Sequence, residues 1–297
     1  MIEPTNFCNL KCPLCPSGSG QLTRPRGYMN FDLYKNIIDQ IKKDSFMVLL
    51  WNQGEPFLHK DICKMIEYAS QANLIIGLST NANVMPNIND LVNSGLDELI
   101  ISIDGITQET YNKYRVNGDL ATVLQNITSL VEKKTELKKH TPRIVGQFIV
   151  MKHNEHEIEE TKILFKKMKI DKLALKTVQI YSKDDIIKFL PSNPKYQRYK
   201  IKNKDFTLKF GLKNRCYRIW NQPVINWDGE MAVCCYDKDN VYRVGSFSLP
   251  TPNSQLPTIS ALWKSKKFMT FRKNVLKNRK MHEICRNCGE GVSLRIK

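Results

Sequence analysis

Over the first 180 residues, short runs of β-branched and other apolar residues alternate with longer stretches whose apolar positions recur every three or four residues. The stretch 120–138 is typical of these predicted helices, because an apolar stripe follows Asp119, a residue suited to cap a helix N-terminus. The predicted strands are 46–51, 74–79, 98–102, 143–151 and 172–179, preceded by a short stub at 2–4. The predicted helices are 31–43, 60–71, 88–93, 120–138 and 155–168.

The order of these elements predicts the fold class. Strands that alternate with helices favour an α/β protein with parallel strands. Eight such units close a TIM barrel, so the six found here predict a partial (β/α)6 TIM-like barrel with its active site at the C-terminal strand ends. We expect the barrel over 1–180, a connector with some helix over 181–214, and a small Cys-rich domain over 215–297.

Composition excludes several classes of protein. With 41% hydrophobic and 25% charged residues in a chain of 297, the mixture is that of a globular protein. The longest apolar runs fall far short of the ~20 residues that cross a bilayer. The first residues contain no basic region followed by an apolar stretch, so no secretory signal is expected and the predicted location is the cytoplasm.

The chain is strongly basic, with 46 Lys and Arg against 29 Asp and Glu and a net charge of +17. The lysines are spread over helical stretches, where a solvated helix face is the ordinary explanation. Because no nucleic-acid-binding motif accompanies them, a nucleic-acid partner is not expected. The charge would suit a phosphorylated substrate.

Three cysteines follow the stub at 2–4 directly: Cys8, Cys12 and Cys15 form a C-x3-C-x2-C motif. Three thiolates on one loop can hold an iron–sulfur cluster, which normally takes four cysteine ligands, so that one iron stays open. An incompletely ligated metal is a site for chemistry. The structural alternatives are a zinc knuckle or three free buried cysteines, but the next cysteine, Cys63, is remote.

This motif, within EPTNFCNLKCPLC, resembles the signature of radical S-adenosylmethionine (SAM) enzymes. The segment WNQGEP, at the end of the second predicted strand, is similar to the family's Gly-Gly-Glu-Pro motif, with Gln53 in place of the first glycine. The resemblance implies that Gly54, Glu55 and Pro56 bind the amino group of SAM, and a carboxylate suits an ammonium group that offers only donors. The family often has an aromatic residue before the third cysteine, where this chain has Leu14.

The resemblance extends to the ends of the later strands. It implies that a Ser-Thr-Asn segment at 79–81 and a Ser-x-Asp segment at 102–104 contact the ribose of SAM, although Asp104-Gly105 also reads as a turn. An arginine that faces SAM's carboxylate and a glutamine that contacts its sugar are implied further along. The SAM-contacting residues implied in these segments are Ser79, Asn81, Ser102, Asp104, Arg115 and Gln147.

A second group of cysteines lies near the end of the chain, in a C-x12-G-x4-C motif followed by a C-x2-C pair. The spacing alone is compatible with zinc or with an iron–sulfur cluster. The pattern is similar to the SPASM and twitch extensions of many radical SAM enzymes, which carry auxiliary [4Fe-4S] clusters. Full SPASM domains continue after the C-x2-C pair with further cysteines. In this chain Leu294 occupies the position of the first of these cysteines. The resemblance therefore implies the shorter, twitch-like form with one cluster. Its implied ligands are Cys216, Cys234, Cys285 and Cys288.

Two cysteines are left over, and for both the ordinary explanation is a packed small apolar side chain. Cys63 lies in the predicted helix 60–71, and Cys235 stands beside an implied cluster ligand. A further hypothesis is that Cys235 donates a hydrogen atom to a substrate radical.

The resemblance implies an enzyme with two [4Fe-4S] clusters that reductively cleaves SAM to a 5′-deoxyadenosyl radical and abstracts hydrogen from its substrate. We expect a small polar substrate (a sugar, an aminocyclitol or a phosphorylated compound), dehydrogenated or epimerised, and an electron donor such as flavodoxin or ferredoxin. Residues chosen as candidates for substrate contact are Lys176, Arg218, Tyr236 and Asp237.

Two alternatives stay open. One is modification of a peptide. A single implied auxiliary cluster and the lack of a leader-binding domain before the barrel argue against it. The segment before Cys8 is short, which suggests that Met1 is not the natural start. The other is a zinc-stapled binding module on an inactive barrel.

Overall fold

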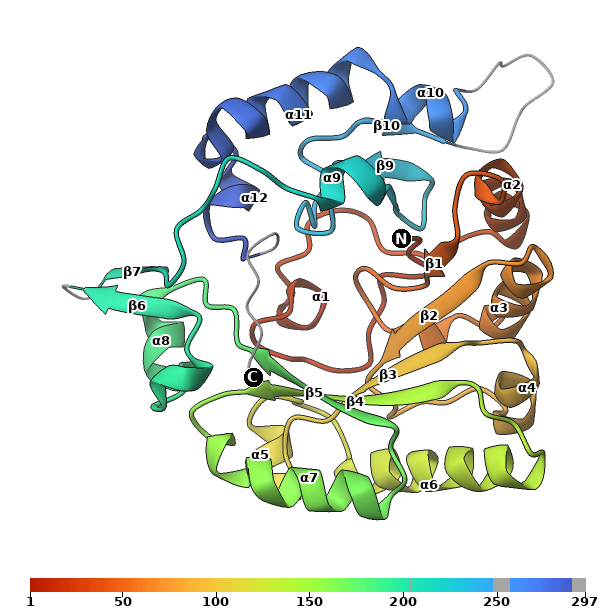
Figure 1. The fold of residues 1–297 in the computed structure, drawn as a ribbon, viewed down its shortest axis with the longest axis vertical. Coiled ribbons are helices and arrows are strands. Elements are labelled where there is room, and N and C mark those ends of the chain that lie inside the picture. The colour runs from red at the N-terminus through yellow and green to blue at the C-terminus, as the bar shows by residue number, and fades with distance from the viewer. Residues whose placement is uncertain (203–204, 248–256, 290–297) are drawn as a thin grey trace.

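The computed structural model describes residues 1–202, 205–247 and 257–289. Its centre is a parallel sheet in the order β1-β2-β3-β4-β5, so the strands lie side by side in chain order (Figure 1). The register places strand ends with functional side chains next to each other, as with Ser102 beside Gln147. The strands are β1 (Met47–Leu49), β2 (Ile75–Thr80), β3 (Glu98–Ser102), β4 (Arg143–Val150) and β5 (Lys172–Thr177).

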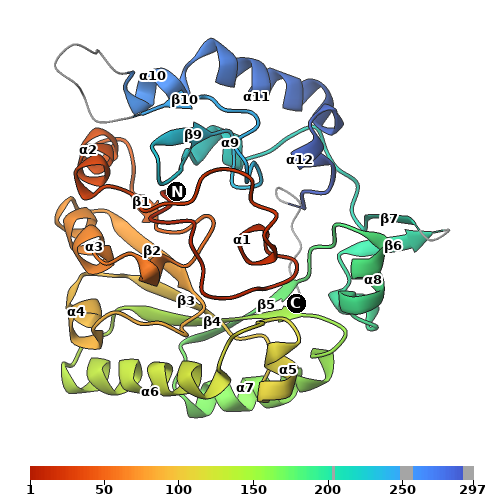
Figure 2. The same cartoon turned by 180° about the vertical axis from the view of Figure 1, so that it is seen from behind.

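Helices cover the outer face of this sheet, and the first cysteine loop lies inside its curve (Figures 1 and 2). Their apolar stripes enter one core with the strands, and Asn30 and Asp119 accept backbone N–H bonds at the starts of two of them, as the sequence predicts for Asp119. The five predicted helices are confirmed as α2 (Phe31–Ile41), α3 (Ile62–Gln71), α4 (Ile88–Asn93), α6 (Leu120–Glu136) and α7 (Ile158–Lys167).

The described chain differs from the predicted pattern in three respects. The stub at 2–4 forms a single bridge instead of a sixth strand of the sheet. Short helical segments that have no room for a full apolar stripe also follow several strands and loops: α1 (Pro16–Ser19), η1 (Pro56–Leu58), α5 (Gln108–Asn112) and η2 (Glu155–Glu157). The connector holds more than helix: α8 (Lys183–Phe189), η3 (Pro194–Tyr196) and an antiparallel hairpin of β6 (Tyr199–Lys202) and β7 (Asp205–Leu208).

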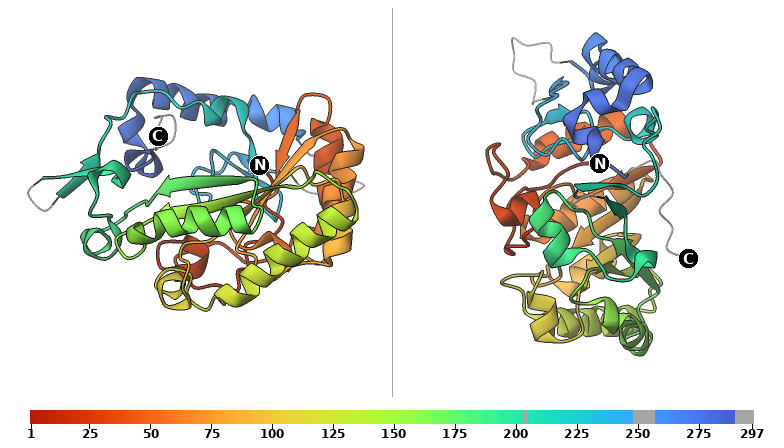
Figure 3. Two further views of the ribbon diagram at one scale, coloured as in Figure 1. Left: turned by 60° about the horizontal axis from the view of Figure 1, so that its bottom comes forward. Right: turned by 90° about the vertical axis from the view of Figure 1, so that its left-hand side faces the viewer.

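The C-terminal part is a small antiparallel sheet in the order β10-β9-β8 with helices packed beside it. Figure 3 shows this part, in blue, stacked on one side of the barrel. Its helical segment packs inward through Leu262, Phe268 and Phe271, which are buried, while Trp263 is half-buried. The elements are α9 (Arg218–Asn221), β8 (Val224–Ile225), β9 (Glu230–Ala232), β10 (Gly245–Ser246), α10 (Ile259–Trp263), α11 (Lys266–Asn278), η4 (Arg279–Met281) and α12 (Glu283–Arg286).

The stub at 2–4 joins the two parts. Ile2 donates its N–H to Leu49 O at 2.9 Å on the barrel side, and its backbone bridges Ile225 of β8 on the other. Beside it, the buried carboxylate of Glu3 pairs with Arg24 at 2.5 Å. The N-terminal segment therefore holds the Cys-rich part against the open side of the barrel. Among the described helices, none has the length and apolar character needed to cross a membrane.

Candidate functional site

The first cysteine loop lies between the stub and α1. Cys12 is buried and Cys8 and Cys15 are half-buried. Nitrogen donors approach the thiols: Asn81 Nδ2 lies 4.0 Å from Cys8 Sγ, and Arg115 lies 3.9 Å from Cys12 Sγ. Burial, with smaller contributions from Glu55 and the other two thiols, raises the pKa of Cys8 to about 12. Three thiols on one loop, two of them with a nitrogen donor beside the sulfur, fit an iron–sulfur cluster, whose negative sulfurs such donors stabilise.

Gly54 and Glu55 lie beside this loop because the backbone makes a close approach there. Gly54 has a φ of +78°, and a Cβ at this position would lie 2.6 Å from Phe7 O, so only glycine fits. The Glu55 carboxylate accepts hydrogen bonds from Thr80 Oγ1 at 2.8 Å and from Asn81 N–H at 2.7 Å. Burial raises its pKa to about 7 despite these donors.

The other implied SAM contacts gather at the C-terminal ends of neighbouring strands, as parallel topology dictates. Asn81 follows β2 and donates to Asn9 Oδ1 at 2.9 Å, which ties this strand end to the cysteine loop. Ser79 lies two residues earlier, half-buried. Ser102 ends β3 directly beside the half-buried Gln147 of β4. The structure thus places Asn81 beside Cys8, Ser102 beside Gln147, and Gln147 in one cavity with Cys15.

Asp104 and Arg115 form a buried ion pair with a separation of 2.6 Å. The other oxygen of Asp104 accepts the N–H of Ile149, also at 2.6 Å, and the side chain is fully buried. Burial raises the pKa of Asp104, while Arg115 opposes the rise. Arg115 also reaches Cys12, so Asp104 holds this guanidinium at the cysteine loop. The sequence named both residues but did not predict that they pair with each other.

The four C-terminal cysteines also converge. Cys216 precedes α9, Cys234 follows β9, and Cys285 and Cys288 lie in and after α12. Burial raises the pKa of Cys234 well above its usual value, and the charges of Cys235, Cys288 and Cys285 add to the rise. Cys216 likewise acts on Cys285. Electrostatic interactions therefore link Cys234 to Cys285 and Cys288, and Cys285 to Cys216.

The spacing of these thiols matters for the choice of metal. Within residues 1–202, 205–247 and 257–289, no three His, Cys, Asp or Glu side chains lie close enough together to hold a single metal ion. Four cysteine thiolates are a ligand set of zinc. They are also the ligand set of a four-iron cluster, so this donor set fits an iron–sulfur cluster.

Gly229, the glycine of the C-x12-G-x4-C motif, makes the turn between β8 and β9. Its φ is +81°, and a Cβ here would lie 1.7 Å from Phe247 O. Its carbonyl accepts the N–H of Phe247 at 2.8 Å. The turn brings Cys234 back toward Cys216, which explains why a glycine stands between these two cysteines.

Two neighbouring cavities lie beside the cysteine sites. The first, which we call the barrel-end cavity, measures about 280 Å³ and is lined by Cys15, Gln147 and Lys176. The second, the junction cavity, measures about 760 Å³ and lies between the first cysteine loop and the C-terminal part. Gln179 and Tyr181 line both. The other candidate substrate contacts, Arg218, Tyr236 and Asp237, all line the junction cavity.

Cys235 also lines the junction cavity, with Arg218 3.8 Å from its sulfur. Cys63, in contrast, is half-buried in α3 and packs against the main core. The structure therefore separates the two leftover cysteines: Cys63 packs against the core, and Cys235 lines the junction cavity.

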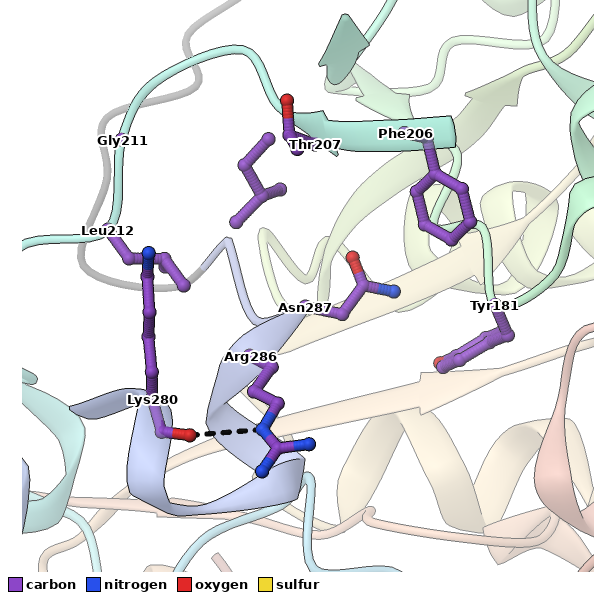
Figure 4. A pocket seen from close by; sticks show the side chains of 9 residues that line it. Tyr181, Phe206, Thr207, Gly211, Leu212, Lys280, Arg286 and Asn287 are labelled. Carbon is purple, nitrogen blue, oxygen red and sulfur yellow. Dashed lines mark hydrogen bonds between the residues drawn. The ribbon is translucent and has the colours of Figure 1, made fainter. Parts of the chain in front are cut away.

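A third cavity of about 490 Å³, the hairpin cavity, opens between the β6–β7 hairpin and α12. Figure 4 shows the rings of Tyr181 and Phe206 and the amide of Asn287 around this space. Tyr181, Arg286 and Asn287 line both this cavity and the junction cavity, so the two are adjacent.

The sequence did not mark several residues that complete the site. Arg198 of the connector donates to Thr177 Oγ1 at 3.0 Å and to Gln179 at 3.3 Å, and Tyr236 donates to the same Gln179 oxygen at 3.0 Å. This network links the barrel-end cavity to the C-terminal part. No local pattern signals it, because its members lie up to 59 positions apart and meet only in the fold.

Comparison with known families identifies both parts. Residues 2–164 match the radical SAM superfamily, and residues 216–289 match the SPASM domain, described as an iron–sulfur cluster-binding domain. The chain belongs to the radical SAM superfamily. As a radical SAM protein with a SPASM domain, it binds SAM and two iron–sulfur clusters. Of the two possibilities that the cysteine spacing left open for the C-terminal site, the match therefore supports an iron–sulfur cluster and not zinc.

Several relatives of this radical SAM protein are known. A tungsten-containing aldehyde ferredoxin oxidoreductase cofactor-modifying protein of Pyrococcus furiosus is 24% identical over 97% of this chain and 86% of its own length. An AdoMet-dependent heme synthase of Methanosarcina barkeri is 29% identical over 56% of the chain, and a PqqA peptide cyclase of Bradyrhizobium diazoefficiens is 23% identical over 61%. The chain matches 46% of each of these last two proteins.

Solved structures share the fold. BtrN in complex with AdoMet and 2-DOIA aligns with a TM-score of 0.56 and 16% identity over 100% of this chain and 94% of its own. Streptococcus suis SuiB bound to S-adenosylmethionine aligns with a TM-score of 0.63 and 14% identity over 99% of this chain and 72% of its own. At such identities the likeness shows the partial barrel with its Cys-rich addition, and confirms the predicted fold class.

Proposed function

We propose that this radical SAM protein dehydrogenates or epimerises a small polar substrate, such as a sugar, an aminocyclitol or a phosphorylated compound, held in the junction cavity. The observation that carries the proposal is that the two cavities are neighbours and share Gln179 and Tyr181. One wall of the barrel-end cavity is Cys15, and the junction cavity that adjoins it through Gln179 and Tyr181 is lined by Cys235. The size of about 760 Å³ suits a small-molecule site.

In this proposal Cys8, Cys12 and Cys15 hold the first cluster, and Cys216, Cys234, Cys285 and Cys288 hold the auxiliary cluster. The reduced first cluster and SAM together supply a 5′-deoxyadenosyl radical when both are bound, with electrons from a donor such as flavodoxin or ferredoxin. All nine cysteines are free of disulfides, which supports a reducing location, the cytoplasm.

The chain's own residues orient SAM. Glu55 and the carbonyls around Gly54 and Pro56 receive its ammonium group, and Arg115, aligned by Asp104, faces its carboxylate. Asn81, Ser79, Ser102 and Gln147 contact its sugar. The polar residues Lys176, Arg218, Tyr236 and Asp237 contact the substrate, because they line the two cavities.

Cys235 donates a hydrogen atom to the substrate radical if the reaction is an epimerisation. The thiyl radical left on Cys235 then becomes a thiol again by taking one electron, supplied by the external electron donor, and one proton. Its thiol lies on the junction cavity, and thiol hydrogens exchange with solvent. In heavy water, an epimerised product therefore gains one deuterium, whereas a dehydrogenated product is lighter by two hydrogens. Mass spectrometry of products from candidate sugars and aminocyclitols distinguishes the two.

A Cys235→Ala variant tests the donor role, with Cys63→Ala as the matched control because Cys63 packs in α3 away from the cavities. We expect Cys235→Ala still to form 5′-deoxyadenosine but to lose the epimerised product. Full turnover of Cys235→Ala with unchanged product stereochemistry would contradict the role.

Peptide modification is the second candidate function. The hairpin cavity lies next to the junction cavity, and the two together would give room for a longer ligand. A curated relative is named a PqqA peptide cyclase, and a structural neighbour is SuiB bound to the precursor peptide SuiA. Formation of 5′-deoxyadenosine that depends on a peptide, and not on small polyols, would favour this function.

A further inference from the structure

Arg279 is a buried cation within the C-terminal cysteine cluster. It begins η4, directly after α11, and its side chain is only 1% exposed. Buried arginines are rare unless they serve a partner, because the cost of removing a guanidinium from water is high. We therefore looked for the groups that the buried guanidinium of Arg279 contacts.

The contacts of Arg279 span the cluster site. One terminal nitrogen donates to Arg215 O at 3.2 Å, next to Cys216, and the other donates to Cys288 O at 3.3 Å. The backbone N–H of Arg279 donates to Asn214 Oδ1 at 3.0 Å. The guanidinium thus bridges two chain segments that carry cluster cysteines and are about 70 positions apart in sequence.

The charge of Arg279 also acts on the thiols. Its side chain also forms a hydrogen bond to Cys285. Through these hydrogen bonds the guanidinium lies against the segments that carry Cys216, Cys285 and Cys288, three of the four proposed ligands of the auxiliary cluster. Among the other charged groups, Asp237 acts on Cys285 in the opposite sense, and Arg215 and Arg286 are exposed, where water and salt weaken their fields.

We propose that Arg279 raises the reduction potential of the auxiliary cluster by holding a buried positive charge against its thiolate ligands. Reduction adds one negative charge to the cluster, and a nearby cation stabilises that reduced form more than the oxidised form. Because the guanidinium is buried, salt screens this effect little. The inference rests on the proposed function, in which Cys216, Cys234, Cys285 and Cys288 are the ligands.

The measurement is a redox titration of the reconstituted full-length protein, followed by electron paramagnetic resonance. Arg279→Gln removes the charge, Arg279→Met removes it in an apolar side chain of similar length, and Arg279→Lys keeps it. We expect the two neutral variants to shift the auxiliary cluster to a more negative potential by about 59 mV, which is a tenfold change in the ratio of oxidised to reduced cluster. Arg279→Lys should keep most of the wild-type potential, and the SAM-binding cluster is an internal reference that should not move.

Arg272 provides the matched control. It is a buried arginine on the neighbouring helix α11, hydrogen-bonded to Ile219 O at 2.8 Å, and burial alone shifts its pKa, with no contribution from a thiol. Arg272→Gln should leave the auxiliary potential unchanged.

Three outcomes would overturn the inference. If both neutral Arg279 variants keep a loaded auxiliary cluster at the wild-type potential, the charge has no effect on it. If Arg272→Gln or Arg279→Lys shifts the potential as much as Arg279→Gln, the cause is structural disturbance instead of lost charge. A wild-type protein without a second cluster signal would contradict the ligand assignment itself, and the inference with it.

Discussion

Glu55 is the residue whose ionisation most directly affects the site. It is fully buried, and burial raises its pKa to about 7, while Asn81, Thr80 and Phe57 donate to its oxygens and oppose the rise. Below this pH the carboxyl is mainly protonated and lacks the charge that would hold an ammonium group. Its ionised form therefore predominates only above about pH 7.

The affinity for SAM should follow this ionisation. We expect the Kd for SAM to fall about tenfold between roughly pH 6 and pH 8, as Glu55 loses its proton. Glu55→Gln should bind SAM more weakly and make the affinity nearly independent of pH in this window. Equilibrium dialysis with labelled SAM measures both effects, and Glu109→Gln, at an exposed glutamate of α5, is the control. An equally steep pH dependence in Glu55→Gln would show that another group titrates.

At the scale of elements, the turn between β8 and β9 determines whether the C-terminal cysteines meet. Gly229→Ala adds a Cβ that would collide with Phe247 O at a positive φ, so the turn must open. We predict loss of the auxiliary cluster, about four of eight irons, with the SAM-binding cluster retained. Iron and sulfide analysis measures the loss.

Variants of two other glycines distinguish backbone strain at a positive φ from collision of the added Cβ. Gly20 has a φ of +79°, but no atom lies within 4 Å of the position that an added Cβ would take, so Gly20→Ala brings strain without collision. Gly211 has neither a positive φ nor an atom within 4 Å of an added Cβ, so Gly211→Ala should leave the iron content unchanged. Full iron content in Gly229→Ala would contradict the role of this turn.

The periodic pattern predicted the barrel well because each strand and helix buries one continuous apolar face. β3 and α4 lie within the predicted bounds, and β4 ends one residue earlier than predicted. The β6–β7 hairpin was missed because its strands are short and partly exposed, so they lack the buried alternation that marks a strand. Sequence motifs found the cysteines because cluster ligands keep fixed spacings, but Arg279 was indistinguishable among 46 basic residues.

At the scale of the whole molecule, one buried ion pair joins three segments of the chain. Arg24 pairs with Glu3 and also donates to Lys238 O at 2.6 Å, while Glu3 accepts the N–H groups of Gln53 and Trp227. The sequence could not predict this junction, since it depends on partners more than 200 positions apart. It fixes the C-terminal part over the barrel opening and so shapes the junction cavity.

Removing the Glu3–Arg24 ion pair should lower the free energy of unfolding of the whole protein. Arg24→Met leaves the Glu3 carboxylate buried without its cation, and we expect a loss of about 3–5 kcal/mol in unfolding free energy. Arg243, more than half exposed in its ion pair with Glu230, is the control, and Arg243→Met should cost at most about 1 kcal/mol. Urea denaturation measures both variants, and equal losses would show that the junction does not depend on the Glu3–Arg24 pair.

The central claim is that two clusters support SAM cleavage, and one measurement tests it most directly. The protein is reconstituted without oxygen, analysed for iron and sulfide, and then incubated with dithionite and SAM. We predict about eight irons per chain and the formation of 5′-deoxyadenosine. A protein that holds its first cluster but forms no 5′-deoxyadenosine would contradict the account.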